Sequence, residues 1–99
     1  MDYVSAVVQY IRLHSNGIKE PVHGWKIAKA LSISDTGVRK WVNEARSGGI
    51  PICSCPSGYY YSEDPENIND TIRMLEGRIA KQKNAIDGLV CCRDSQKDF

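Results

Sequence analysis

Side chains that form directional hydrogen bonds are concentrated between residues 34 and 47. They are Ser34, Thr36, Arg39, Lys40, Asn43 and Arg46. An arginine guanidinium donates two parallel hydrogen bonds, and an asparagine carboxamide donates and accepts at the same time. Lysine adds a compact positive charge. Residue types of this kind are suited to reading flat polar edges and to contacting anionic groups.

A helix over residues 34–47 must present these side chains. Ser34 is a good N-cap, and Gly48-Gly49 ends the helix. The apolar residues recur at helical spacing and define an inward face, formed by Val38, Trp41, Val42 and Ala45. The polar side chains therefore lie on the opposite face, toward solvent.

Further elements precede and follow this helix. Asp2 caps a first helix whose apolar stripe ends near residues 14–17, and a second short helix spans 24–31. We expect Trp25 and Trp41 to belong to the core, because both fall on apolar stripes. Alternating residues from Ile50 to Cys55 and three tyrosines at 59–61 flank a Pro/Gly turn, which predicts a β-hairpin.

The C-terminal third has a seven-residue apolar repeat. Asp64, Pro65 and Glu66 mark a helix start, and the helix is expected over 66–90. Its seam has three isoleucines at a and four residues at d: Ile72, Ile79 and Ile86, then Ile68, Leu75, Gln82 and Leu89. This pattern favours a two-stranded parallel coiled coil between two copies of the chain. Antiparallel pairing, a four-helix arrangement, and a helix folded back onto its own domain remain open.

The run from residue 24 to 62 resembles the winged helix-turn-helix domains of bacterial and phage regulators, in particular the biotin-repressor-like subgroup. The matching residues, in order, are Leu31, Ile33, Ser34, Val38, Arg39, Trp41, Val42, Ala45, Arg46, Gly49, Ile50, Ile52, Gly58 and Tyr59. The short form with a heptad tail is also similar to small phage-encoded proteins. The resemblance implies that the helix beginning at Ser34 is a recognition helix for duplex DNA.

The same resemblance assigns roles to individual residues. Ser34 and Thr36 would lie near phosphate, while Arg39, Lys40, Asn43 and Arg46 would reach the major groove. Lys26 and Lys29, on the preceding helix, suit phosphate positioning. The hairpin departs from the family pattern, because no basic residue lies between Arg46 and Arg73. We therefore expect little phosphate binding from it, and Tyr60 is instead expected to face a protein partner.

Composition limits the alternatives. Residues 1–50 carry seven Lys or Arg and four acids, a net charge of +3, whereas residues 51–99 carry six and eight, a net charge of −2. No phosphate loop or catalytic spacing is present, so we expect no enzyme, no cofactor and no metal.

The four cysteines are interpreted as reduced apolar side chains, with zinc as the lesser alternative. No apolar run approaches membrane-spanning length, and a cytoplasmic location is expected.

The sequence thus predicts a mainly α protein with a small β-hairpin: a winged helix-turn-helix domain at 1–63, a dimerisation helix at 64–92 and a polar tail at 93–99. The expected function is dimeric, sequence-specific binding of double-stranded DNA, in transcription regulation or in organising a replication origin. The alternative is a protein-interaction module, such as a phage-encoded inhibitor or adaptor of a host nucleic-acid machine.

Overall fold

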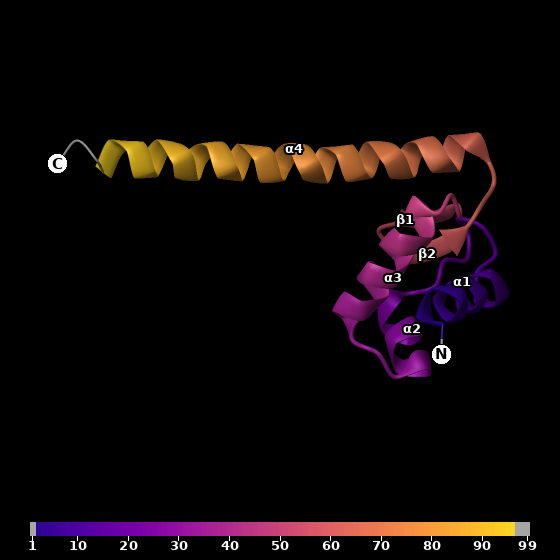
Figure 1. Ribbon diagram of the computed structural model, residues 1–99. Coiled ribbons are helices and arrows are strands. Elements are labelled where there is room, and N and C mark those ends of the chain that lie inside the picture. Colours follow the sequence, from indigo (N-terminus) through magenta and orange to yellow (C-terminus); the bar gives the residue numbers. More distant parts are fainter. Residues whose placement is uncertain (1, 97–99) are drawn as a thin grey trace.

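Five short elements and one long helix make up the protein, and the computed structural model describes residues 2–96 of it (Figure 1). In chain order they are α1 (Tyr3–His14), α2 (Gly24–Leu31), α3 (Asp35–Ser47), β1 (Ile52–Cys55), β2 (Gly58–Tyr61) and α4 (Pro65–Gln96). The predicted class, mainly α with a small antiparallel hairpin and a long C-terminal helix, is confirmed. The helix α4 continues past residue 92, where we expected a polar tail, and residues 97–99 lie outside the described part.

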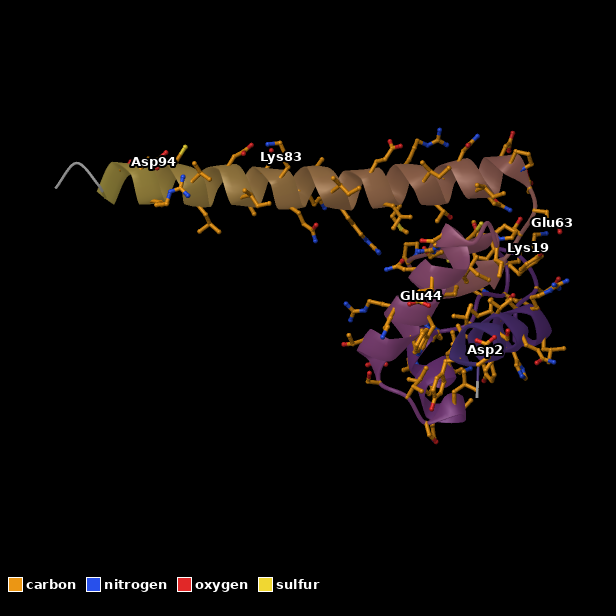
Figure 2. The ribbon with its side chains drawn as sticks, in the orientation of Figure 1. Asp2, Lys19, Glu44, Glu63, Lys83 and Asp94 are labelled. Carbon is orange, nitrogen blue, oxygen red and sulfur yellow. The ribbon has the colours of Figure 1, made fainter. Side chains whose placement is uncertain are left out.

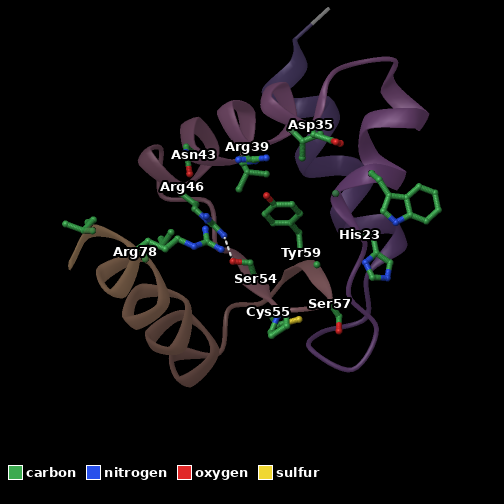
Figure 3. Close-up of a pocket in the computed structure, with 18 of the residues that line it drawn as sticks. His23, Asp35, Arg39, Asn43, Arg46, Ser54, Cys55, Ser57, Tyr59 and Arg78 are labelled. Carbon is green, nitrogen blue, oxygen red and sulfur yellow. Dashed lines mark hydrogen bonds between the residues drawn. The ribbon is translucent and has the colours of Figure 1, made fainter. Parts of the chain in front are cut away.

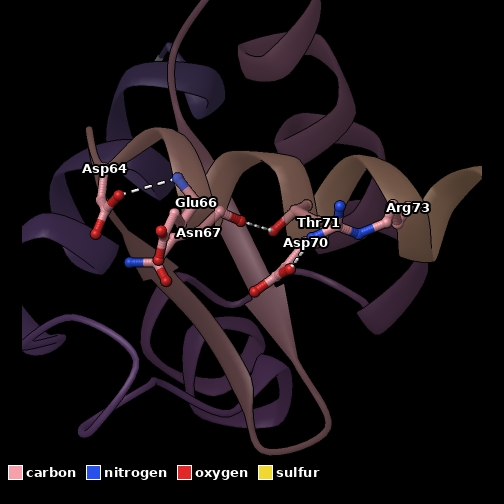
Figure 4. Close-up of polar contacts among 6 residues, drawn as sticks. All are labelled: Asp64, Glu66, Asn67, Asp70, Thr71 and Arg73. Atoms are coloured by element: carbon pink, nitrogen blue, oxygen red, sulfur yellow. Dashed lines mark hydrogen bonds and ion pairs between the residues drawn. The ribbon is translucent and has the colours of Figure 1, made fainter.

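Three helices begin at the capping residues that the sequence predicts. Asp2 accepts a hydrogen bond from a backbone amide three residues later, at 3.3 Å, and Ser34 does the same at 3.0 Å. Asp64 accepts from the amide of Glu66 at 2.9 Å, at the start of α4 (Figure 4). Each bond satisfies one of the backbone donors that a helix start leaves free. Local sequence therefore sets where α1, α3 and α4 begin.

The hydrophobic core lies where α1, α2 and α3 meet the hairpin. Its buried side chains are Val7, Ile11, Val22, Ile27, Ala28, Val38, Val42, Ala45 and Ile52. Trp41 is half-buried and stacks on Tyr3, with ring centroids 5.6 Å apart. The prediction for Trp25 was wrong, since 58% of it is exposed. Residue 25 lies about 200° around α2 from the buried Ile27, so it points away from the core.

The hairpin is joined to the segment that precedes α2. The two strands pair antiparallel, from Ile52 opposite Tyr61 to Cys55 opposite Gly58. On the other side of β2, Val22 and Tyr59 exchange both backbone hydrogen bonds, at 2.7 and 2.8 Å. This bridge ties the chain before α2 to the second strand. As a result, the hairpin has a fixed position relative to the three short helices.

The hairpin also forms the surface on which α4 is docked. Successive strand residues point to opposite faces, and the neighbours Cys53 and Tyr60 are buried outside the main core cluster, near Thr71 of α4. The expectation that Tyr60 faces a protein partner was wrong, because only 1% of it is exposed. Thr71 is 5% exposed, and its hydroxyl accepts a hydrogen bond from the Ser54 amide at 3.2 Å. The hairpin therefore lies between the three short helices and the first turns of α4.

Most of α4 projects beyond the rest of the molecule (Figures 1 and 2). The protein measures 58 × 31 × 23 Å, and its radius of gyration is 17.0 Å. A compact domain of about 100 residues would have a radius of gyration of about 13 Å. Lys83 and Asp94 stand on the part of α4 that lies clear of the domain. Within residues 2–96, none of the helices has both the length and the apolar character required to cross a membrane.

Because most of α4 projects from the domain, the heptad seam has a half-buried part and an exposed part. Ile68 and Leu75 are half-buried in the first turns of α4, beside the domain. The seam's other apolar residues are exposed: Ile72 at 44%, Ile79 at 65%, Ile86 at 58% and Leu89 at 70%. Burial of the stripe by the chain itself, the alternative left open by the sequence, thus applies only to the start of the helix.

The Val22–Tyr59 bridge makes Gly58 difficult to replace. Gly58 has φ +139°, and a Cβ atom added there would lie 2.3 Å from the carbonyl oxygen of Val22. We predict that Gly58→Ala lowers the free energy of unfolding by about 1–3 kcal/mol from backbone conformation alone. Gly77→Ala, on α4 with no atom near the new methyl group, should instead raise it by about 1 kcal/mol. Urea unfolding followed by circular dichroism measures both, and a Gly58→Ala variant as stable as wild type would contradict the packing described.

Candidate nucleic-acid interface

An open groove of about 770 Å³ lies between α3, the hairpin, the start of α2 and α4 (Figure 3). The side chains of Asp35, Arg39, Asn43 and Arg46 line it from α3, at spacings that place them on one face of that helix. Tyr59 lies in the middle of the hollow. The groove contains three arginines and one aspartate, so its walls carry net positive charge.

The structure brings together only part of the predicted DNA-binding set. Arg39, Asn43 and Arg46 line the groove, and the first two are exposed. The remaining members are exposed but lie outside the lining: Lys26, Lys29, Ser34, Thr36 and Lys40. Two of them belong to α2, and the other three belong to the start and first turns of α3. The set therefore divides into a groove-lining group and a peripheral group.

Lys40 is turned toward the aromatic side of α3. Its Nζ lies 4.7 Å from the ring centroid of Trp41, within the range of a cation–π interaction. Lys26 has a similar position on α2, with its Nζ 5.7 Å from the ring of Trp25. Both side chains are long and exposed, and the aromatic contacts are weak enough that either ammonium group can move to a nearby anion.

Arg46 differs from the other basic residues because it is built into the fold. Its Nε donates to the Ile52 carbonyl at 2.7 Å, and one terminal nitrogen donates to Ser54 Oγ at 3.0 Å. Burial lowers the pKa of the Arg46 guanidinium, and the nearby charge of Arg78 acts in the same direction. The first role of Arg46 is to hold the end of α3 against β1, with its charge still facing the groove.

The fourth wall of the groove comes from α4, which sequence reasoning did not connect with α3. Leu75, Ile79 and Gln82, all predicted for dimerisation, line the groove together with Arg78. Arg78 extends toward Arg46 and Ser54 in Figure 3. Two guanidinium groups thus converge at the α4 end of the groove. No local signal links Arg78 to residue 46, because the contact depends on how α4 docks on the hairpin.

The opposite rim of the groove carries exposed aromatic residues. His23 and Trp25 stack with ring centroids 6.2 Å apart and an interplanar angle of 16°, and both line the groove. The sequence alone does not reveal the exposure of Trp25, because two apolar stripes can be drawn along α2 and only packing shows that Ile27 and Ala28 are the buried residues. An apolar residue off the buried stripe is a candidate contact residue.

The four cysteines are free thiols with different surroundings. Cys53 is buried, Cys55 is half-buried, and the adjacent Cys91 and Cys92 are exposed on α4. Burial raises the pKa of the Cys53 thiol, which keeps it protonated near neutral pH. Across residues 2–96, His, Cys, Asp and Glu side chains do not gather in groups of three or more that could hold a metal ion. The zinc interpretation therefore has no geometric support in the described part of the chain.

Comparison with known proteins leaves the site to be interpreted from its own chemistry. No protein family, curated protein or solved structure matches the chain. The groove, its charges and the exposed face of α3 are consequently the basis for assigning a function.

The two arginines of α3 should respond differently to replacement. Arg46→Met keeps the aliphatic stem but removes both hydrogen bonds to β1, and we predict a loss of about 1.5–3 kcal/mol in the free energy of unfolding. Arg39→Met, at an exposed position without such bonds, serves as the matched control and should change stability by less than about 0.5 kcal/mol. Thermal and urea unfolding test this, and equal effects of the two substitutions would refute the division of roles.

Proposed function

We propose that this protein binds double-stranded DNA by placing the exposed face of α3 in the major groove. The observation that carries the proposal is the pairing of Arg39 and Asn43 on adjacent turns of one helix face, in a positively charged groove. Arginine pairs bidentately with guanine, and asparagine pairs bidentately with adenine. Both side chains are free of competing hydrogen bonds within residues 2–96 and can turn toward base edges.

The arrangement of the elements supports the same proposal. The turn between α2 and α3 has Ser32 in the left-handed region, with φ 55°, and Ser34 caps the helix that follows. Helix–turn–helix, then a hairpin bonded back to the chain before α2, is the order expected of a winged helix-turn-helix domain. With 13 residues, α3 is about 20 Å long, and a helix about 10–12 Å across fits a major groove about 12 Å wide.

The position of α4 indicates which end of α3 can contact the bases. Arg78 stands near Arg46, in the last turn of α3, so α4 crowds the C-terminal end of the α3 face more than its N-terminal half. Recognition helices of this kind contact bases mainly with their N-terminal residues. Arg39 is therefore assigned the principal base contact, and Asn43 the next one along the helix.

Phosphate contacts are assigned to the peripheral group. Ser34 and Thr36 lie at the start of α3, where free backbone amides favour an anion. Lys26 and Lys29 of α2, and Lys40 of α3, are exposed and supply additional positive charge. Such contacts position a protein on the duplex without reading its sequence. Because they are few, one copy binds weakly, and a second copy joined through α4 would supply the additional affinity.

The biological role that fits this chemistry is transcription regulation or organisation of a replication origin, in the cytoplasm. Protein binding is the competing function, and one observation favours it: Trp25 is 58% exposed at the rim of the groove, on the same side as a hairpin turn without basic residues. Exposed tryptophan and arginine are typical anchors of protein interfaces. A partner with an acidic surface would suit the same charged walls.

Replacing Arg39 tests the proposal. We predict that Arg39→Ala weakens binding to a selected duplex by about 1–3 kcal/mol and relaxes the preference at one base pair. Arg73→Ala is the matched control, since Arg73 pairs with Asp70 on the exposed side of α4 (Figure 4). It should leave affinity and base preference nearly unchanged.

Fluorescence anisotropy with the selected duplex and its single-base variants measures both effects. If Arg39→Ala and Arg73→Ala bind the duplex equally well, α3 does not read the major groove. If neither variant nor the wild type binds duplex DNA, the protein-interaction function takes precedence.

A further inference from the structure

The projecting part of α4 carries an apolar stripe that remains largely exposed in the described chain, and its member Ile79 also lines the groove beside α3. Residues 81–89 are all exposed, and Ile72, Ile79, Ile86 and Leu89 are between 44% and 70% exposed. These four are also the exposed apolar members of the heptad seam. A helix stripe of this width, with Glu76 and Lys83 on one side and Arg78 on the other, is the surface that another helix of the same kind covers.

The flanking charges decide how a second copy would be oriented. In the heptad register, Glu76 and Lys83 occupy e positions, and Arg78 occupies a g position. In a parallel pair, a g residue faces the e residue five positions later in the partner. Arg78 would then face Lys83 of the partner subunit, and symmetry would repeat this repulsion. Parallel pairing is therefore penalised twice by like charges.

In an antiparallel pair, e residues face e residues and a residues pack against d residues. One alignment places Ile72 opposite Leu89 of the partner subunit and Leu75 opposite Ile86 of the partner subunit. It also places Glu76 opposite Lys83 of the partner subunit, and symmetry provides the reciprocal pair. This alignment contains two attractive contacts, and Arg78 faces the neutral Ala85 of the partner subunit.

Neighbouring antiparallel alignments are disfavoured by the same charges. Sliding the partner by one heptad in one direction brings the two copies of Glu76 face to face at the symmetry axis. Sliding it in the other direction does the same for Lys83. The alignment that overlaps residues 72–89 is thus selected by charge, and its limits coincide with the first and last exposed apolar residues of the seam.

We propose that two copies of the chain associate through antiparallel packing of residues 72–89 of α4, with Glu76 of each copy paired to Lys83 of the other. This deepens the proposed function, on whose homodimer it rests, and it replaces the parallel pairing expected from the sequence. Lys83 is available for the contact because its ion pair with Asp87, at 3.3 Å, is exposed and contributes little to stability.

The proposed helix pairing also involves residues that line the candidate nucleic-acid interface. Ile79 and Gln82 line the groove beside α3 and are at the same time in the centre of the paired segment. Association therefore covers the α4 wall of the groove, and it carries the two α1–β2 domains to opposite ends of the paired helices. Two α3 faces held apart in this way would contact two separate stretches of duplex.

A charge reversal at residue 83 distinguishes the two orientations by the sign of its effect. In the antiparallel pair, Lys83→Glu faces Glu76 of the partner subunit, and the dimer dissociation constant should rise by about 3- to 30-fold. In a parallel pair, the new glutamate faces Arg78 of the partner subunit, and the constant should fall. Sedimentation equilibrium of the full chain measures it, and circular dichroism confirms that α4 remains helical.

Two further variants complete the test. The double variant Glu76→Lys/Lys83→Glu restores attraction in the antiparallel pair and should return the dissociation constant to within about threefold of wild type. Lys81→Glu, the same charge change at an outward position of the same helix, should have little effect. A Lys83→Glu variant that associates as well as wild type, or better, overturns the proposal, as does a wild-type chain that stays monomeric. Duplex binding, measured separately at low salt, reports on the proposed function whichever orientation is found.

Discussion

Ser54 links the two helices that form the walls of the groove. Its hydroxyl accepts a hydrogen bond from the Arg46 guanidinium of α3, and its backbone amide donates to Thr71 of α4. Both bonds are partly buried, where the loss of a partner is costly. One residue of a four-residue strand therefore fixes the distance between α3 and α4. The shape of the groove, the exposure of the α3 face and the direction in which α4 leaves the domain all depend on this link.

Local patterns were sufficient to predict most of the fold. The caps at Asp2, Ser34 and Asp64 and the apolar spacing within each segment indicated the helices, and the Pro/Gly turn indicated the hairpin. Such signals act over three or four residues, so no knowledge of packing is needed. The prediction for Trp25 was wrong because its exposure depends on packing and not on a local signal. In a helix of eight residues, two stripes can be drawn through the apolar positions, and only packing decides which one is buried.

The candidate site was less predictable because its parts come from distant segments. The polar face of α3 followed from its own sequence, but the structural role of Arg46 depends on the position of β1. The groove depends on α4, whose heptad pattern cannot distinguish burial within the chain from burial by a partner. The structure divides that pattern at about Leu75, where the helix leaves the domain. The charges at Glu76, Arg78 and Lys83 become informative only when the remaining stripe is known to be exposed.

If α3 lies in the major groove, the positively charged face around it must bind duplex DNA through phosphate contacts. A salt titration of binding to a random-sequence duplex, followed by fluorescence anisotropy, measures this most directly. We predict binding at about 50 mM salt and a linear fall of the logarithm of the affinity with the logarithm of salt concentration, with a shallow slope because the contacts are few. Absence of binding at about 50 mM salt, or an affinity independent of salt, would contradict it.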